Sequence, residues 1–331
     1  MEYKIDKKYE TLQYRPWQPN RPTSKGSTAY HDAVVNADYY MKNVDELADI
    51  MAPKIKEDEV VVDFGAGTGV SALRLLKKVK LSFKLYLVDN SAAWLGKAYE
   101  ILSSNQNVKC FLLEKLKFRY TTLAEAIGEE AADHVISANT VHLIPNLEET
   151  FKGINESLKP AGSFTFQSGN ITRPNREKGI LMVDDTINRV HDLALDIVRT
   201  NNKFAGYRED LDKNIESEGT QRKFVFPEPR PEEFYINVLE SCGFDCKQPH
   251  HKIIKIKYKD WLDFLRVKRL QAGILPEVGG KEPSSQEEND RDDIITMASK
   301  QLFKELQNEN PFADDKCFTA EWVYFTAAKK E

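Results

Sequence analysis

An acid followed by three alternating glycines is the stretch of this chain whose residue types and spacing could do chemistry. Residues 60–69 run from three valines into Asp63 and then through Gly65, Gly67 and Gly69. Apolar residues that end in a glycine-rich turn predict a buried strand, and residues 70–79 have the composition of a helix. Glycine allows positive φ and lacks Cβ, so a ligand can lie directly on the backbone where the helix begins. The pattern therefore predicts a nucleotide-type site at the carboxyl end of a parallel strand.

A second acid supports that site. Residues 83–90 read as the next strand, which ends at Asp89, 20 residues beyond Gly69. A carboxylate at this distance is placed to accept hydrogen bonds from both hydroxyls of a ribose. A strand-terminal Asp can also simply cap the following helix, which starts near Ser91. Together with the glycine motif, Asp89 favours the cofactor interpretation.

The spacing of the glycines distinguishes between ligands. A dinucleotide site has the form G-x-G-x-x-G, and a pyrophosphate would be repelled by Asp63, which argues against a dinucleotide-dependent oxidoreductase. The form acid-x-Gly-x-Gly-x-Gly resembles the first motif of class I S-adenosylmethionine-dependent methyltransferases. An acid there suits a ligand whose amino acid end is cationic. The resemblance covers residues 30–170 by ordered motifs and residues 230–328 by the order of elements.

The resemblance implies a fold class and a set of cofactor contacts. The fold is α/β, a Rossmann-like seven-stranded sheet with helices on both faces and an antiparallel last strand. The cofactor is S-adenosyl-L-methionine, with S-adenosyl-L-homocysteine as product. The implied cofactor-binding residues are Asp63, Phe64, Gly65, Ala66, Gly67, Gly69, Asp89, Asn90, Glu114, Ala138 and Asn139. Glu114 would bind the adenine amino group, and Ala138 and Asn139 would pass beneath the methionine part.

His142 is the candidate catalytic residue. Residues 133–145 resemble the family's fourth strand, where a turn carries a His before Ile-Pro. One interpretation makes His142 a base at the mouth of the pocket, because His titrates near neutrality. The other makes it a structural residue that ties this loop to the next helix. Methyl transfer is an in-line displacement driven mainly by proximity and desolvation, so a base is needed only for an acceptor that arrives protonated.

Helical segments outside the minimal fold are predicted to cover the site. Residues 1–29, with prolines at 16, 19 and 22, predict an extended arm, and residues 30–55 read as a helix. The candidate substrate-side residues are Tyr30, His31 and Tyr39 on that helix and Gln167 and Asn170 at the end of the fifth strand. The aromatic residues could instead only pack the helix on the sheet.

Residues 30–331 are predicted to form one methyltransferase domain with two insertions, about 171–230 and 259–310. Substrate-specific parts commonly lie on loops above a fixed scaffold, so both insertions are interpreted as caps, with solvated decoration as the alternative. A helix is predicted within residues 180–198, followed by a charged stretch over 201–223. Residues 279–293 are predicted to be an exposed polar loop, and 294–306 a helix.

Composition narrows the classes of partner. The chain has 331 residues, a net charge of −5 and no apolar run near the ~20 residues that span a bilayer. An acidic chain lacks the basic surface of a nucleic-acid binder, so neither nucleic acid nor membrane is expected as a partner. Cys242 and Cys246 precede His250 and His251, but a zinc knuckle spacing and a second ligand pair are missing, so no metal is expected. The charged start, Met1 to Lys4, predicts a cytoplasmic protein.

These observations predict a methyltransferase that acts on a small-molecule acceptor, at an oxygen, nitrogen or carbon atom. The signature of amino-methylating enzymes is missing, because Asn139 is followed by Thr140-Val141 and not by two prolines and an aromatic residue. The alternative is a non-catalytic module that binds S-adenosylmethionine and acts through a protein partner. Such a module would keep the glycine loop but have an occluded substrate side.

Overall fold

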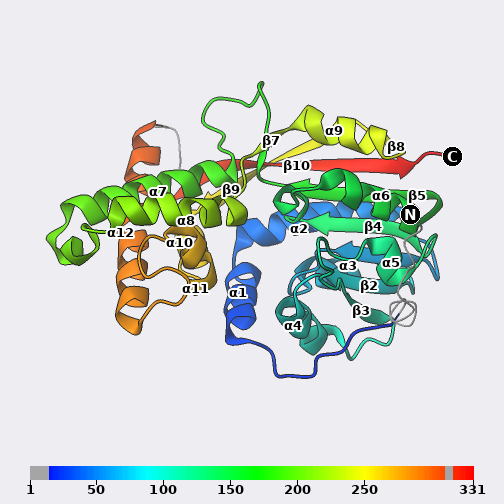
Figure 1. The fold of residues 1–331 in the computed structure, drawn as a ribbon. Coiled ribbons are helices and arrows are strands. Elements are labelled where there is room, and N and C mark those ends of the chain that lie inside the picture. Colours follow the sequence, from blue (N-terminus) through cyan, green and yellow to red (C-terminus); the bar gives the residue numbers. More distant parts are fainter. Residues whose placement is uncertain (1–14, 310–315) are drawn as a thin grey trace, which may run out of the picture.

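A twisted sheet of eight strands forms the centre of the molecule (Figure 1). The computed structural model describes residues 15–309 and 316–331. The strands of the sheet are β1 (Val60–Phe64), β2 (Lys84–Asp89), β3 (Val108–Leu112), β4 (Ala132–Ala138), β5 (Leu158–Ser168), β8 (Phe244–Cys246), β9 (His250–Lys257) and β10 (Cys317–Lys329). Their order is β3-β2-β1-β4-β5-β10, with β8 and β9 both paired to the far side of β10.

The predicted parallel core is present, with one point where the strand order reverses. Strand β1 pairs in parallel with β2 on one side and with β4 on the other. In open α/β sheets, ligands bind at the carboxyl ends of the strands beside such a reversal. Strand β1 is buried along its whole length, as expected for a strand covered on both faces. The glycine motif after β1 therefore lies where the topology favours a ligand.

Helices cover both faces of the sheet. The helices are α1 (Lys25–Val35), α2 (Asp38–Met51), α3 (Val70–Lys78), α4 (Ala92–Leu102), α5 (Leu123–Ile127), α6 (Leu147–Ser157), α7 (Val183–Thr200), α8 (Leu211–Val225), α9 (Glu232–Ser241), α10 (Tyr258–Leu265), α11 (Lys268–Ile274) and α12 (Ser285–Glu309), with short 3₁₀ helices η1 (Ala52–Lys54), η2 (Val141–Leu143) and η3 (Asn202–Tyr207). Helices α2, α3 and α4 pack on one face, and α5, α6 and α9 on the other. Alternate residues of β1 divide between the two cores, since Val61 faces the first and Val62 the second.

The helices within residues 171–230 and 259–310 pack against one another and are named the cap. Helices α7, α8, α10, α11 and α12 form the left-hand part of Figure 1, and α1 lies between them and the sheet. Their buried residues continue the core of the α2–α3–α4 face. The ends of the first insertion are held side by side, because β6 (Ile171–Thr172) pairs in parallel with β7 (Arg230–Pro231). The cap is therefore fixed to the sheet at the end of β5.

Several predicted boundaries were wrong. The arm ends earlier than residue 29, because α1 begins at Lys25 after the capping residue Ser24, whose side chain accepts from the N–H of Ser27. Residues 1–14 of the predicted arm lie outside the described residues. The single helix predicted over 30–55 is two helices that break at residues 36–37. The charged stretch over 201–223 contains helix α8.

Two further differences concern the C-terminal part. The predicted loop over 279–293 is helical from Ser285, since Ser284 and Glu287 form reciprocal capping hydrogen bonds. The predicted seven strands are eight, because the sixth is divided into β8 and β9, which pair with successive parts of β10. The class of fold and the antiparallel last strand are as predicted. Across the described ranges, 15–309 and 316–331, no helix combines the length and apolarity of a membrane span.

Candidate active site

The glycine loop leaves room for a ligand at its middle residue. Gly65, Gly67 and Gly69 all have positive φ, at 71°, 53° and 79°. A Cβ on Gly65 would come within 2.3 Å of the Thr140 side chain, so this glycine lets the loop after β4 approach the loop after β1. A Cβ on Gly67 would meet no atom within 4 Å, so the backbone of Gly67 faces open space. Gly67 is half-buried, and the absence of a side chain leaves its backbone as a surface on which a ligand can lie.

Asp63 is a buried carboxylate with one oxygen engaged. Its Oδ2 accepts from the hydroxyl of Ser71 (2.6 Å) and from the N–H of Ala72 (3.1 Å), which lie in the first turn of α3. Its Oδ1 is buried and has no hydrogen-bond partner among the described residues. Burial raises the pKa of Asp63 to about 7, although these two hydrogen bonds act in the opposite direction. A buried oxygen without a donor fits the cationic amino group of S-adenosylmethionine.

Asp89 lies against the glycine loop. Its Oδ2 accepts from the N–H of Gly67 (2.9 Å), and its Oδ1 accepts from the N–H of Ser91 (2.8 Å). Each oxygen keeps a second lone pair, so the carboxylate can still accept from two ribose hydroxyls. Burial raises the pKa of Asp89, and the N–H groups of Gly67 and Ser91 oppose that shift. The structure thus brings together the two acids and the central glycine of the predicted site.

Helices α1 and α2 place side chains beside this site. His31 Nδ1 lies 3.0 Å from the hydroxyl of Thr68, inside the glycine loop. Tyr30 is half-buried, and the Tyr40 hydroxyl lies beside both the Tyr30 hydroxyl and Asn139. Asn139 has a φ of 50°, a left-handed conformation that Asn tolerates better than most residues. Their role as a lid toward the substrate stays a prediction.

Three side-chain amides meet at the carboxyl ends of β4 and β5. The Oδ1 of Asn43, on α2, accepts from Gln167 Nε2 (2.8 Å) and from Asn139 Nδ2 (3.4 Å). Asn139 Oδ1 accepts in turn from the indole N–H of Trp322 (3.2 Å). The Oε1 of Gln167 is buried without a partner among the described residues. Sequence reasoning missed Asn43, although a polar residue between the apolar positions Tyr39 and Leu47 of one helix face was an available signal.

His142 and Asn170 meet at Ser168, the last residue of β5. The N–H of Asn170 donates to Ser168 Oγ (2.9 Å), so the hydroxyl can donate its own proton to His142 Nδ1 at 2.9 Å. Burial lowers the pKa of His142 to about 4, and the nearby charge of Arg230 adds to that effect. His142 is therefore neutral at pH 7. The Oδ1 of Asn170 is buried and has no partner in the described part of the chain.

Asp184 is a second residue that the sequence interpretation missed. It lies in the first turn of α7, next to Val183, whose N–H donates to the carbonyl of Gly169 directly after β5. Only 8% of Asp184 is exposed, and its carboxylate has no hydrogen bond to a described residue. Burial raises the pKa of Asp184 to about 7, with the neighbouring charge of Asp185 in the same direction. No local pattern marks this acid, because its burial comes from the packing of the cap.

Three predicted residues lie apart from these contacts. Tyr39 is in the core between Trp261 and Trp322, with ring centroids 5.7 and 6.2 Å away. Asn90 and Glu114 are exposed, and Glu114 follows β3 with its N–H bound to the hydroxyl of Thr121 (2.9 Å). Their contacts with the cofactor stay predictions.

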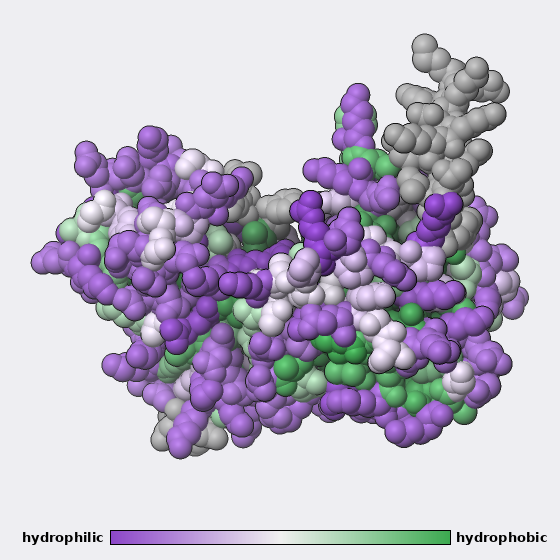
Figure 2. All heavy atoms as spheres, turned by 90° about the horizontal axis from the view of Figure 1, so that it is seen from below, coloured by the Kyte–Doolittle hydropathy of each residue, from purple (hydrophilic) through white to green (hydrophobic). Residues whose placement is uncertain are grey.

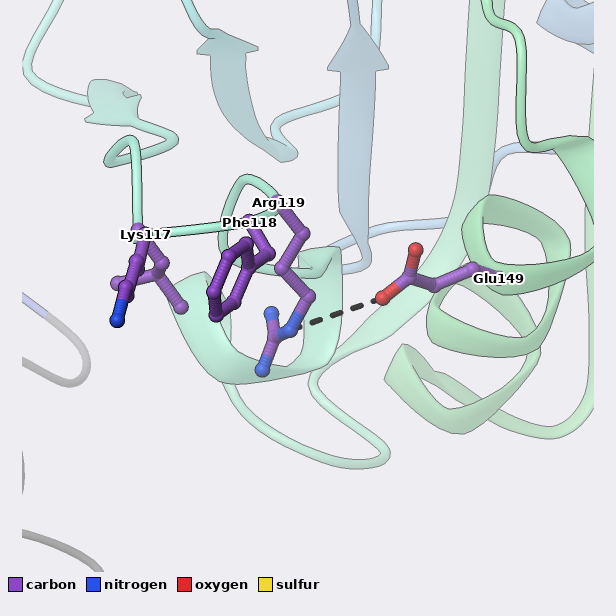
Figure 3. Close-up of a pocket in the computed structure, with 5 residues that line it drawn as sticks. Lys117, Phe118, Arg119 and Glu149 are labelled. Carbon is purple, nitrogen blue, oxygen red and sulfur yellow. Dashed lines mark ion pairs between the residues drawn. The ribbon is translucent and has the colours of Figure 1, made fainter.

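A hollow of about 460 Å³ opens near Glu114, on the connection between β3 and α5 (Figure 3). Its walls include Lys117, Phe118 and Arg119, and the Arg119 guanidinium is paired with Glu149 of α6 across it (3.6 Å). None of the predicted site residues lines this hollow. It is a surface feature beside the α5–α6 face and is separate from the glycine loop.

The sheet order, the glycine loop and the two acids define an α/β nucleotide-type site, and comparisons with known proteins identify its class. A family profile described as a methyltransferase domain matches residues 55–225, more than half of the 331-residue chain. The chain therefore belongs to the methyltransferase-domain family. It is a class I S-adenosylmethionine-dependent methyltransferase, and S-adenosyl-L-methionine is its cofactor.

Among similar proteins are two fungal synthases. The chain is 26% identical over 170 residues to the highly reducing polyketide synthase ctvA of Aspergillus terreus, a match that covers 46% of this chain and 7% of the synthase. It is 29% identical over 103 residues to the hybrid PKS-NRPS synthetase poxE of Penicillium oxalicum, which covers 31% of this chain and 2% of that protein. The chain thus corresponds to a small part of these relatives.

A solved structure supports the fold. Phosphoethanolamine N-methyltransferase 2 of Haemonchus contortus, in complex with phosphomonomethylethanolamine and S-adenosylhomocysteine, is 15% identical in sequence with a TM-score of 0.50. The alignment covers 94% of this chain and 60% of that chain. At this identity the likeness concerns the fold alone.

Proposed function

We propose that this methyltransferase acts on a small-molecule acceptor held between the carboxyl edge of the sheet and its own cap. The observation that carries the proposal is a set of buried polar atoms without partners on the cap side of β5. Among the described residues these are Gln167 Oε1 and Asn170 Oδ1, and the mostly buried Asp184 lies in the first turn of α7. Buried polar groups are normally hydrogen-bonded, so such a set indicates a polar ligand. Helix α7 begins directly beside them, which favours an acceptor small enough to be enclosed.

The names of similar proteins support the same class of acceptor. Two relatives are named as synthases of polyketides or of polyketide–peptide hybrids. The similar solved structure contains phosphomonomethylethanolamine, a small molecule. A folded macromolecule would have to displace the cap that the β6–β7 pairing fixes at the end of β5.

The residues of the site bind and orient the reactants. The cofactor, when bound, supplies an electrophilic methyl group. Asp63 would hold its amino group and Asp89 its ribose, while the backbone of Gly67 leaves room between them. The amides of Asn139 and Gln167 would orient the acceptor side. Fixing two reactants in line supplies most of the rate in such displacements, because translational and rotational entropy is lost on binding and not at the reaction step.

Two groups could take a proton from an acceptor that carries one. His142 is neutral at pH 7, but the lone pair of its Nδ1 accepts from Ser168, so it could act as a weak base only if that hydrogen bond breaks. Asp184, with a pKa of about 7, is the better matched of the two at neutral pH. We assign neither as essential, because an acceptor that arrives deprotonated needs no base.

The thiols are consistent with a reducing, cytoplasmic setting, which we also propose. Cys110, Cys242 and Cys246 are free thiols. Burial raises the pKa of Cys110 to about 12 and that of Cys246 to about 11, so these thiols are poor nucleophiles and poor metal ligands at neutral pH. His250 and His251 bind Glu46 and Glu232, at 2.8 and 2.6 Å, and not the cysteines.

The test has two arms. Calorimetric titrations with S-adenosylmethionine, S-adenosylhomocysteine and NAD should show micromolar binding of the two sulfur ligands and none of NAD. The protein is then incubated with methyl-labelled S-adenosylmethionine and either the small-molecule or the macromolecular fraction of a cell extract. Label transferred only to compounds in the small-molecule fraction supports the proposal. Transfer only to protein or nucleic acid would overturn the choice of acceptor, and absence of cofactor binding by folded protein would overturn the site.

A further inference from the structure

Arg269 reaches from the cap to the cofactor side of the sheet. It lies on α11, and its guanidinium carbon is 4.3 Å from the centroid of the Trp94 ring. Trp94 is in the first turn of α4, the helix that follows Asp89 and β2. A guanidinium at this distance over an indole is in attractive cation–π contact. The contact joins two segments that are far apart in the sequence.

The hydrogen-bond donors of Arg269 are unused. The arginine is exposed at the rim, and its guanidinium forms no hydrogen bond or ion pair with a described residue. Stacking leaves the edge of the guanidinium free, because its five N–H donors lie in the plane of the group. The positive charge is close enough to Asp89 to favour the ionised form of that carboxylate. Arg269 therefore presents donors next to Trp94, in the first turn of the helix that follows the acid predicted to bind ribose.

Aromatic contacts hold this arrangement on the lid. The ring of Tyr30 meets Trp94 edge-on at 4.8 Å and lies 6.1 Å from the ring of Phe264 on α10. Tyr30 in turn lies beside Tyr40. The face that contains α1 and α4 is mostly hydrophilic, with hydrophobic side chains gathered near its middle (Figure 2). The cap, α1 and α4 thus share one set of contacts at the edge of the proposed cofactor site.

We propose that Arg269 is a cofactor-binding residue supplied by the cap, which closes the adenosine end of the pocket by stacking on Trp94 and donating hydrogen bonds to the adenosine moiety. The inference rests on the proposed placement of ribose against Asp89. It extends the cofactor site to a residue outside the 55–225 region that matches the methyltransferase-domain family. Cofactor affinity then depends on the position of the cap.

The experiment compares variants by calorimetric titration with S-adenosylhomocysteine and with methylthioadenosine, which keeps the adenosine and lacks the amino acid. Arg269→Ala should weaken both ligands about tenfold, since the hydrogen bonds from the guanidinium to the adenosine moiety are lost. Arg269→Lys should give an intermediate loss, because charge remains but the planar donor edge does not. The matched control is Arg266→Ala on the same segment, whose guanidinium is paired with Asp292 at 2.6 Å. It should change affinity less than twofold.

The outcomes separate this inference from the proposed function. Wild-type protein that binds neither ligand contradicts the cofactor site itself. Wild-type binding with equal affinities in Arg269→Ala and Arg266→Ala overturns the role of Arg269 alone. Tighter binding by Arg269→Ala also overturns it, because Arg269 would then compete with ribose for Asp89. Thermal unfolding of each variant checks the fold, and Trp94→Phe combined with Arg269→Ala should lose less affinity than the sum of the two single changes.

Discussion

Asp63 of β1 and Glu321 of β10 are both buried carboxylates, but their hydrogen-bond partners lie at very different distances along the chain. Asp63 accepts from Ser71 and Ala72, only 8 and 9 residues further along the chain. Glu321, on β10, is bound by Arg173 and Arg176 of the first insertion, 148 and 145 residues away. The cofactor half is thus built from neighbours in sequence, and the cap from segments that only folding brings together.

The electrostatic consequences also differ. Burial raises the pKa of Asp63 to about 7, and one of its oxygens lacks a donor. Burial acts in the same direction on Glu321, but the hydrogen bonds and charges of two arginines outweigh it and hold the pKa of that carboxyl below its usual value. Both oxygens of Glu321 are bound by arginines, while Oδ1 of Asp63 has no donor among the described residues. The comparison predicts that changes in the cap affect stability, and changes at the glycine loop affect binding.

Removal of Glu321 should give the largest effect. Glu321→Ala should lower the free energy of unfolding by about 3–5 kcal/mol, because two arginines lose a partner that is 1% exposed. The pKa of Glu321 is lowered on folding, so its contribution is present above the ordinary pKa of Glu and is lost as the pH falls through the folded value. Urea unfolding at pH 7 measures the change. The matched control Glu305→Ala removes an exposed partner of Arg189 and should cost about 0–1 kcal/mol. Equal losses of unfolding free energy in Glu321→Ala and Glu305→Ala would contradict the special contribution of the buried carboxylate.

Asp89→Ala should mainly reduce ligand binding, whereas Glu321→Ala should mainly reduce stability. Affinity for S-adenosylhomocysteine should fall by about 1.5–3 kcal/mol, or roughly ten- to hundredfold, because charge-assisted hydrogen bonds to ribose are lost. Stability should change less than in Glu321→Ala. The control Asp245→Ala removes an exposed carboxylate of β8 and should leave affinity unchanged. Calorimetry that finds the same affinity in Asp89→Ala as in the wild type would remove Asp89 from the ribose role.

Asp63 should make cofactor binding depend on pH. With a folded pKa of about 7, this carboxyl is mostly neutral at pH 6 and mostly charged at pH 7.5, so affinity for a cationic amino group should rise roughly tenfold over that range. Because the pKa is raised on folding, the contribution of Asp63 to the stability of the ligand-free protein is present below about pH 4 and is lost as the pH rises through about 7. Titrations in buffers of different ionisation enthalpy would detect the released proton. The cofactor affinity of Asp63→Asn should not change with pH. If the affinity of that variant still depends on pH, another group causes the dependence.

His142→Ala should have the smallest effect on binding, with cofactor affinity within about twofold, since His142 contacts Ser168 and no residue of the glycine loop. Its pKa of about 4 makes it a weak base, so turnover should fall by less than the roughly hundredfold typical of a lost general base. Burial lowers this pKa, so the contribution of His142 to stability is present above about pH 6.5 and is lost as the pH falls through about 4. Turnover measured across pH 6–8 with an identified acceptor tests the role. A loss larger than a hundredfold would establish His142 as the base.

The sequence by itself determined the parts that depend on interactions between neighbouring residues in the chain. The strand from Val60 to Phe64, the glycine loop and Asp89 were predictable, because strand periodicity and the freedom of glycine are properties of consecutive residues. A local signal was also present but not used at Ser284, where the pattern Ser-x-x-Glu marks the start of α12 inside a segment predicted to be a loop from its polarity.

Only the tertiary structure decided which distant residues lie around the proposed site. Asn43 reaches Gln167 from α2, Asp184 becomes buried beside the end of β5, and Arg269 reaches Trp94 from α11. A polar residue on an apolar helix face marked Asn43, but no flanking pattern marks Asp184 or Arg269, since their contacts depend on how the cap packs against the sheet. The backbone that binds a cofactor is specified by a short motif, whereas the side chains that enclose it are supplied by whichever helices the core places nearby.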